Sequence, residues 1–443
     1  MNSSLNRKIS IGSLIRFSLP TILSMVFMGF YTTVDGIFVS RLVGTDALSA
    51  VNIVWPMITA ALAVGTMLGS GGSAIVARKM GAGKSEEARQ NFSLILLTAL
   101  AASLLLVGLG FWALNPFIRF LGADDLLFPY CMDYAVPSLY LFPFAILSMV
   151  FQVFFIAAGK ASLGLFISIL GGLCNIVLDY VFIALLGWGI SGAAIATGAG
   201  YSFTAVTGIF YFWLNRKGSL YLVRPRWDLH VILKSCTNGS SEMVTNLSMG
   251  VTTLMLNRVL MRLSGPDGVA SITIILYVYS LLSSAYIGYS MGIAPIISYN
   301  YGRQDTARLK KIFRISMLCI ACFSVFTVLL SLLCASILVS VFSPKGSSVY
   351  EMAVQGYRLF SVCFLFIGFN GFGSAMFTAL SDGRVSAILS FLRTLVFAIA
   401  AIAVFPAIWG INGVWLAIPA AELLGFAVTV YYWIRMRKVY HYI

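Results

Sequence analysis

Charged residues are scarce in this sequence, and histidine is nearly absent. Asp, Glu, Lys and Arg together make up 10% of the 443 residues, and there are two histidines, His230 and His441. Because both lie in polar segments without a neighbouring nucleophile–base pair, we do not expect an enzyme. No glycine-rich Walker A loop follows a predicted strand, so the sequence gives no basis for ATP hydrolysis by this chain. Neither a resident cofactor nor a transition-metal site is expected.

Long apolar stretches dominate the sequence instead. Hydrophobic residues account for 60% of the chain, which is more than a water-soluble domain can bury, so lipid must surround it. Each stretch has about 20 residues or more, enough for a helix to cross roughly 30 Å of hydrocarbon. The predicted fold class is therefore an all-α integral membrane protein with twelve transmembrane helices. The predicted spans are 14–40, 47–77, 91–114, 130–158, 162–186, 190–214, 236–262, 269–299, 312–342, 352–380, 385–408 and 412–434.

Basic residues are distributed unevenly between the two sides of the predicted membrane. The formal net charge is +14. If the spans alternate from a cytoplasmic N-terminus, 22 of the 29 Lys and Arg residues fall on the cytoplasmic side and 6 on the other. This positive-inside pattern places both termini in the cytoplasm. It explains the basic charge by topology and by contact with membrane lipids, and not by nucleic-acid binding.

The sequence contains an internal repeat. A single offset of 221 residues relates three pairs of landmarks: the segments 44–51 and 265–272, Gly81 and Gly302, and the segments 189–192 and 410–413. One offset that holds across three landmarks indicates the duplication of a half-protein. The acids do not follow this symmetry, because Asp35 corresponds to Leu256 and Asp179 corresponds to Ala400.

The repeat divides the chain into two lobes of six helices each. We expect an N-terminal lobe at 1–217, a cytoplasmic connector at 218–229 and a C-terminal lobe at 230–443. Because six is even, both lobes enter the membrane with the same orientation, as in two-lobed secondary transporters. The cleft between the lobes is then the expected substrate path.

Two aspartates lie inside spans of the N-terminal lobe. Asp35 lies about 21 residues into span 1 and Asp179 about 17 residues into span 5, so both are in the outer half at about 1.5 Å per residue. Asn175 precedes Asp179 by one helical turn, and Thr197 enters from outside to the same depth. Two close carboxylates cannot easily both be charged in a low dielectric, so a proton or cation must neutralise one of them. Oxygen ligands without Cys or His favour H⁺ or a hard cation such as Na⁺.

Other residues inside spans are candidates for the substrate cleft or for gating. Glu422 lies in the middle of span 12, and the repeat pairs it with Tyr201. It either faces the cleft, where it would suit a cationic substrate, or forms a buried hydrogen-bond hub. Glu242 is either a gate or proton stop-over, or it extends to the inner interface. Asn370 in span 10 joins this group. Prolines within the spans invite kinks, and Pro20 in span 1 is the candidate for a functional bend.

Several of these features resemble the multidrug and toxic compound extrusion (MATE) family over nearly the whole chain. They are the Pro20…Asp35 pair, the loop 77–84, the Asn175–Asp179 pair followed by Thr197, and the segment 238–246 at the start of span 7. The resemblance is to the prokaryotic DNA-damage-inducible-like branch. It implies that the matching aspartates couple transport to protons or sodium, and that span 1 bends at Pro20 after protonation.

The resemblance also sets limits. Another branch of the family carries a cation site in the C-terminal lobe with an acid in span 10. Here that span has Asn370 and no acid beyond Glu351 at its outer edge. The family further implies a monomer in the cytoplasmic membrane of a bacterium.

The predicted function is a secondary active antiporter that exports amphipathic, often cationic organic compounds in exchange for H⁺ or Na⁺. The 33 Phe, 20 Tyr, 17 Met and 8 Trp residues suit soft, adaptable contacts with small organic substrates. The alternative is a flippase for a lipid-linked substrate from the same superfamily. A flippase should have a strongly basic cleft, whereas only Arg393 lies deep in a span.

Overall fold

The structure is nearly all helical, as the apolar stretches predict. The computed structural model describes residues 5 and 8–443, except for the side chains at 31–37, 40, 41, 45, 46 and 48. No strand occurs in this described part. The helices are α1 Ile11–Phe38, α2 Thr45–Gly81, α3 Ser85–Phe120, α4 Phe128–Ala157, α5 Ala161–Asp179, α6 Gly189–Leu214, α7 Leu229–Gly302, α8 Thr306–Ser340, α9 Ser348–Phe360, α10 Phe364–Ala379, α11 Gly383–Phe391 and α12 Ala398–Tyr440. Four short segments interrupt or extend them: η1 Val39–Val43, η2 Tyr180–Leu185, η3 Ser361–Cys363 and η4 Leu392–Phe397.

Ten helical stretches of the described chain are long and apolar enough to cross a membrane. Two of them, Leu229–Gly302 and Gly383–Tyr440, are 74 and 58 residues long, about twice what one crossing needs. Each contains a glycine with non-helical backbone angles, Gly265 with φ 64° and Gly410 with φ 56°. Counting one crossing on either side of each glycine brings the number of crossings in the described chain to twelve, as the sequence predicts.

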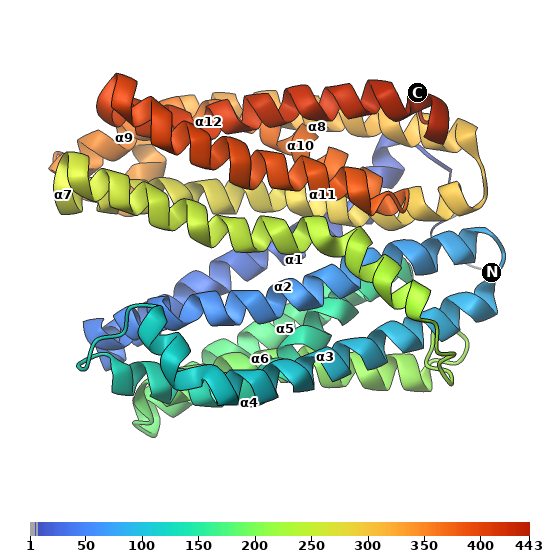
Figure 1. The fold of residues 1–443 in the computed structure, drawn as a ribbon, viewed down its shortest axis with the longest axis horizontal. Helices are drawn as coiled ribbons and strands as arrows, with labels where there is room; N and C mark the ends of the chain where they lie inside the picture. The colour runs from blue at the N-terminus through green and yellow to red at the C-terminus, as the bar shows by residue number, and fades with distance from the viewer. Residues whose placement is uncertain (1–4, 6–7) are drawn as a thin grey trace.

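Contacts along α2 show that α7 doubles back at Gly265. A Cβ placed on Gly71 of α2 would collide with the carbonyl of Ser235, and one on Gly81 would collide with the carbonyl of Tyr299. The two glycines are ten residues apart on one helix, whereas their partners are 64 residues apart on α7 (299 − 235). The chain must therefore reverse direction between these partners. Figure 1 shows α7 running the length of the molecule and returning.

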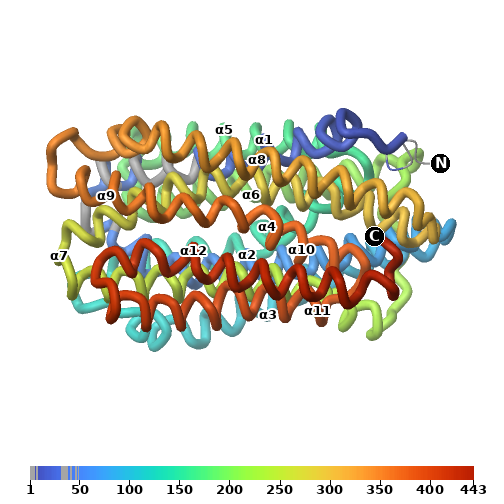
Figure 2. The backbone as a smooth tube through the Cα atoms, turned by 90° about the horizontal axis from the view of Figure 1, so that it is seen from above, coloured from blue at the N-terminus to red at the C-terminus, as the bar shows by residue number. Residues whose placement is uncertain are grey.

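The two halves of the chain meet near the end of the molecule where both termini lie, as Figures 1 and 2 show. There Gly81 lies against the carbonyl of Tyr299, and Gly302 lies against the carbonyl of Arg78. The repeat offset of 221 carries Gly81 to Gly302 and Arg78 to Tyr299, so the two contacts are the same contact seen from each half. Reciprocity of this kind is what a two-fold axis between the halves requires.

Small residues allow this close approach, because lipid provides no hydrophobic drive for helices to associate. The same pattern continues along the interface between the halves, where Gly288 and Gly292 of α7 pack against Ile22 and Ser18 of α1. Large apolar side chains are instead exposed on the outer surface, among them Trp112 at 84% and Leu333 at 82%. An exterior of this composition is the one expected to face lipid.

Gly302→Ala should destabilise the structure, because the added Cβ would collide with the carbonyl oxygen of Arg78. We expect a loss of roughly 1–3 kcal/mol in the free energy of unfolding, as for an overpacked interior. The measurement is the melting temperature of the purified protein in detergent. Gly371→Ala is the matched control, since its Cβ would have no neighbour within 4 Å. Equal melting temperatures for the two variants would contradict the close contact between Gly302 and the carbonyl of Arg78.

Candidate functional site

Three of the four predicted coupling residues come together in the N-terminal half. Asn175 and Asp179 are 2% and 0% exposed on α5. The Asn175 Nδ2 group donates a hydrogen bond to Asp179 Oδ2 at 3.1 Å and lies 3.5 Å from the Thr197 hydroxyl on α6. The fourth, Asp35, falls within α1, but its side chain lies outside the described residues. An acid, an amide and a hydroxyl therefore form one buried cluster.

Glycines bring α5 and α6 close enough to build this cluster. A Cβ on Gly171 would lie 3.0 Å from the carbonyl oxygen of Gly200, and one on Gly200 would lie 2.9 Å from the carbonyl oxygen of Gly171. A Cβ on Gly200 would also lie 3.2 Å from the Cβ of Asn175. Because these positions carry no side chain, the backbones touch and Thr197 reaches the amide of Asn175.

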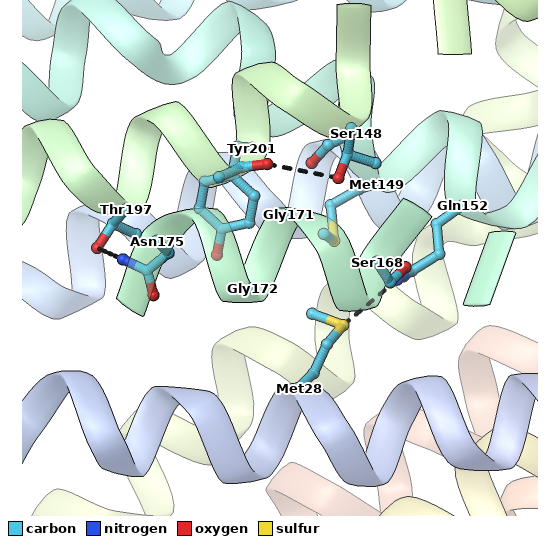
Figure 3. A pocket seen from close by; sticks show the side chains of 12 residues that line it. Met28, Ser148, Met149, Gln152, Ser168, Gly171, Gly172, Asn175, Thr197 and Tyr201 are labelled. Atoms are coloured by element: carbon cyan, nitrogen blue, oxygen red, sulfur yellow. Dashed lines mark hydrogen bonds between the residues drawn. The ribbon is translucent and has the colours of Figure 1, made fainter. Parts of the chain in front are cut away.

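A cavity of about 30 Å³ adjoins the cluster, which is room for about one water molecule or one small ion. Figure 3 shows the side chains that surround it. It is lined by Met28, Ser148, Met149, Gln152, Ser168, Gly171, Gly172, Asn175, Thr197, Gly200, Tyr201 and Thr204. The Oδ1 atom of Asn175 is buried and accepts no hydrogen bond from the side chains that the structure describes. The cavity thus has an oxygen available for a hydrogen-bond donor or a cation.

The helix is irregular where the acid lies. The α-helical part of α5 ends at Asp179, and the π-helical segment η2 follows it directly. A π turn changes the helical register, and such turns are frequent at functional sites. In the C-terminal half, a second π-helical segment, η4, contains Arg393.

A second polar cluster lies in the C-terminal half. Arg393 Nη1 is 3.3 Å from Glu422 Oε1, and the two side chains are 11% and 7% exposed. The Asn370 Nδ2 group donates to Glu422 Oε2 at 2.7 Å and to the Glu422 carbonyl at 2.8 Å. The Thr429 hydroxyl in turn donates to Asn370 Oδ1 at 3.1 Å. Glu422 is therefore the centre of a buried hydrogen-bond network that includes an ion pair.

The predicted cleft and gate residues do not lie in one place. Tyr201 lines the cavity of the N-terminal half, whereas Asn370 and Glu422 bind each other in the C-terminal half. Glu242 is half-buried on α7. Pro20 is half-buried within α1, which continues through it as one helix.

Comparison with known proteins places this arrangement in a family. The model of the MatE family matches residues 20–181 and 242–403, more than half of the chain. The chain belongs to the MatE family. The second matched segment begins 222 residues after the first (242 − 20), within one residue of the repeat offset of 221 found at the sequence landmarks. Members of this family are membrane transporters and not enzymes.

The similarity to known relatives extends over almost the whole length of this chain. The multidrug export protein MepA of Staphylococcus saprophyticus is 23% identical over 93% of this chain and 90% of its own. A solved structure of a multidrug resistance MATE family transporter in an outward-facing conformation has a TM-score of 0.91 at 25% identity, with 99% of this chain and 98% of that one covered. A MATE crystal structure in complex with MaL6 has a TM-score of 0.92 at 24% identity, with 100% and 99% covered.

The sequence analysis did not identify several of the residues around the cavity. Gln152 on α4 donates a hydrogen bond to the Ser168 hydroxyl at 3.2 Å and lies 3.4 Å from the sulfur of Met28. It therefore links α1, α4 and α5 at the cavity. The sequence carried one signal for Gln152, which is an amide in the middle of an apolar span. Polar side chains inside a membrane are costly and tend to be functional. Met28 gave no such signal, since methionine is ordinary in an apolar helix.

Glu422→Leu should be strongly destabilising, because it leaves the guanidinium of Arg393 buried without its partner. Removing one member of a buried pair costs roughly 3–5 kcal/mol, whereas replacing both members by apolar residues is often neutral. We therefore expect a large fall in melting temperature for Glu422→Leu and substantial recovery in the double variant Glu422→Leu/Arg393→Met. Additive losses in the double variant would show that the two charges do not interact in the folded protein.

Proposed function

We propose that the protein is a secondary active antiporter that exports amphipathic, often cationic organic compounds in exchange for H⁺ or Na⁺. The observation that carries this proposal is the buried cluster of Asn175, Asp179 and Thr197 beside a cavity in the N-terminal half. Asp35 is proposed as the second acid of this site. The outward-exporting role is supported by the multidrug export relatives.

The chemistry of the cluster suits a small exchangeable cation. A carboxylate that is 0% exposed is costly within the membrane unless a positive charge or a proton neutralises it. The ligands offered by Asp179, Asn175 and Thr197 are oxygens, and the adjoining cavity has room for about one small particle. Hard cations such as Na⁺, and protons, are the ions that such oxygens bind. We propose that binding of either ion is the coupling event.

Alternating access of two lobes would link the ion to export. The proposed lobes are 1–217 and 230–443, joined by the connector 218–229, with both termini cytoplasmic. Close glycine packing holds the halves together at the end that carries the termini, and the fold resembles an outward-facing transporter. In the proposed cycle, an external cation neutralises the cluster, span 1 repacks with a bend at Pro20, and substrate leaves outward. The loaded lobes then rock to face inward.

Asp179→Asn and Asp35→Asn should each strongly reduce ion-driven export. The assay is efflux of a fluorescent organic cation from proteoliposomes, with a pH gradient and a Na⁺ gradient imposed separately. We expect one gradient to drive transport in the wild type, with a loss of roughly 5- to 150-fold in either variant, the usual range for coupling between two sites. The gradient that drives transport identifies the coupling ion.

Asp125→Asn is the matched control for these variants, because the Asp125 side chain is 95% exposed and pairs with Arg119 at a helix end. It should transport like the wild type. Transport that ignores both gradients, or that survives in both aspartate variants, would overturn the coupling site and turn attention to Glu242 and Glu422.

A further inference from the structure

The C-terminal cluster occupies the positions that correspond to the cavity of the N-terminal half. The turn after α4 recurs after α10 at an offset of 222, because the amide of Lys160 bonds to the carbonyl of Phe155 as that of Asp382 bonds to the carbonyl of Phe377. This offset carries Ser148 to Asn370 and Gly171 to Arg393, and the offset of 221 at the next landmark carries Tyr201 to Glu422. All three N-terminal members of these pairs line the cavity. All three C-terminal members belong to the network around Glu422. The duplicated scaffold therefore forms a cavity in one half and a bonded charge pair at the corresponding positions of the other.

The difference begins with a glycine that has become an arginine. Gly171 contributes no side chain to its cavity, whereas its counterpart Arg393 extends a guanidinium to Glu422. Room for the arginine stem comes from Gly425 on α12, where a Cβ would lie 2.9 Å from the Arg393 Cγ. The counterpart of Gly425 in the other half is Thr204, a cavity-lining residue. The fold thus accommodates the cationic side chain of Arg393 in the space beside Glu422.

The hydrogen bonds of the network converge on the side chain of Glu422. The Asn370 NH₂ group faces two acceptors, the backbone carbonyl and a carboxylate oxygen of Glu422, and these fix the orientation of the amide. That NH₂ group donates to a carboxylate oxygen of Glu422, and Arg393 donates to the same carboxylate. Because a guanidinium does not lose its proton in proteins, the positive charge beside Glu422 is permanent.

The guanidinium of Arg393 is the counter-charge of Glu422 in this region. Without it, Glu422 would be a nearly buried acid within the membrane beside the amide of Asn370, which would favour the uptake of a cation.

We propose that Arg393 is a tethered cation that permanently occupies a cation-binding site in the C-terminal half, so that ion exchange is confined to the N-terminal half. The ligand class of the underlying site is a small planar organic monocation, with guanidinium as the closest match to the group now bound there. The site itself is independent of the proposed antiport, and only the confinement of exchange rests on that function.

Binding of free guanidinium to Arg393→Ala tests the site directly. The variant removes the side chain beyond Cβ and leaves Glu422, Asn370 and Thr429 in place. Millimolar guanidinium, far below denaturing concentration, should raise the melting temperature of the purified variant in a saturable way, by roughly 2–4 °C. Urea has a similar shape without the charge and should give no such rise. The wild type, whose site is already filled, should respond to neither compound.

The double variant Arg393→Ala/Glu422→Gln is the matched control, because it keeps the vacated space but removes the carboxylate. It should lose the guanidinium response. If Arg393→Ala does not accumulate, Arg393→Gln removes the same charge with less loss of volume and enters the same assay. Absence of any response, or an equal response in the wild type or in the double variant, would overturn the proposal and leave the pair with a purely structural role.

A transport assay separates this proposal from the proposed antiport. In proteoliposomes, Arg393→Ala should lose transport, and millimolar guanidinium should restore it at least in part. Asp179→Asn should not be restored by guanidinium, because its defect lies in the other half. If the wild type shows no ion-driven transport, the antiport fails while the guanidinium melting assay still decides the site. Lost transport that guanidinium fails to restore, despite binding, would overturn the confinement of exchange.

Discussion

Water is absent from the interior of a lipid bilayer, and the structure of this chain follows from that constraint. A backbone amide in hydrocarbon must be satisfied within its own segment, so the described chain crosses as helices. A polar side chain must likewise find its partner inside the protein. The polar residues accordingly occur in bonded sets, such as Asn175 with Asp179, and Thr429 with Asn370 and Glu422. In our proposal, the Asn175–Asp179 set is where the coupling ion binds.

The same constraint is met differently in the two halves of a duplicated scaffold. In the N-terminal half, the acid of α5 binds the amide of Asn175 beside a cavity with room for a small particle. In the C-terminal half, the acid of α12 binds an arginine supplied by the protein itself. In our proposal, the first arrangement exchanges its cation and the second keeps it. The duplicated scaffold would then have a single site that exchanges its cation.

Packing without a hydrophobic drive explains the second recurring feature, which is glycine at helix contacts. Lipid tails are as apolar as leucine, so helices associate through close backbone approach. Gly81 and Gly302 allow it between the halves, and Gly171 and Gly200 allow it between α5 and α6. The second pair also sets the distance between Asn175 and Thr197. Glycine in this protein therefore connects the packing of the helices to the geometry of the candidate site.

The sequence by itself determined the membrane class, the repeat and the all-helical fold, because hydropathy and a fixed offset are local or periodic signals. It also indicated the Asn175–Asp179 pair, since four residues make one helical turn. Only the tertiary structure decided that Arg393 binds Glu422, 29 residues away, and that Asn370 binds it across 52 residues. Such pairs depend on how each helix is rotated and on where the chain reverses, as it does at Gly410. Hydrophobic periodicity carries no information about either, because a membrane helix is apolar on every side.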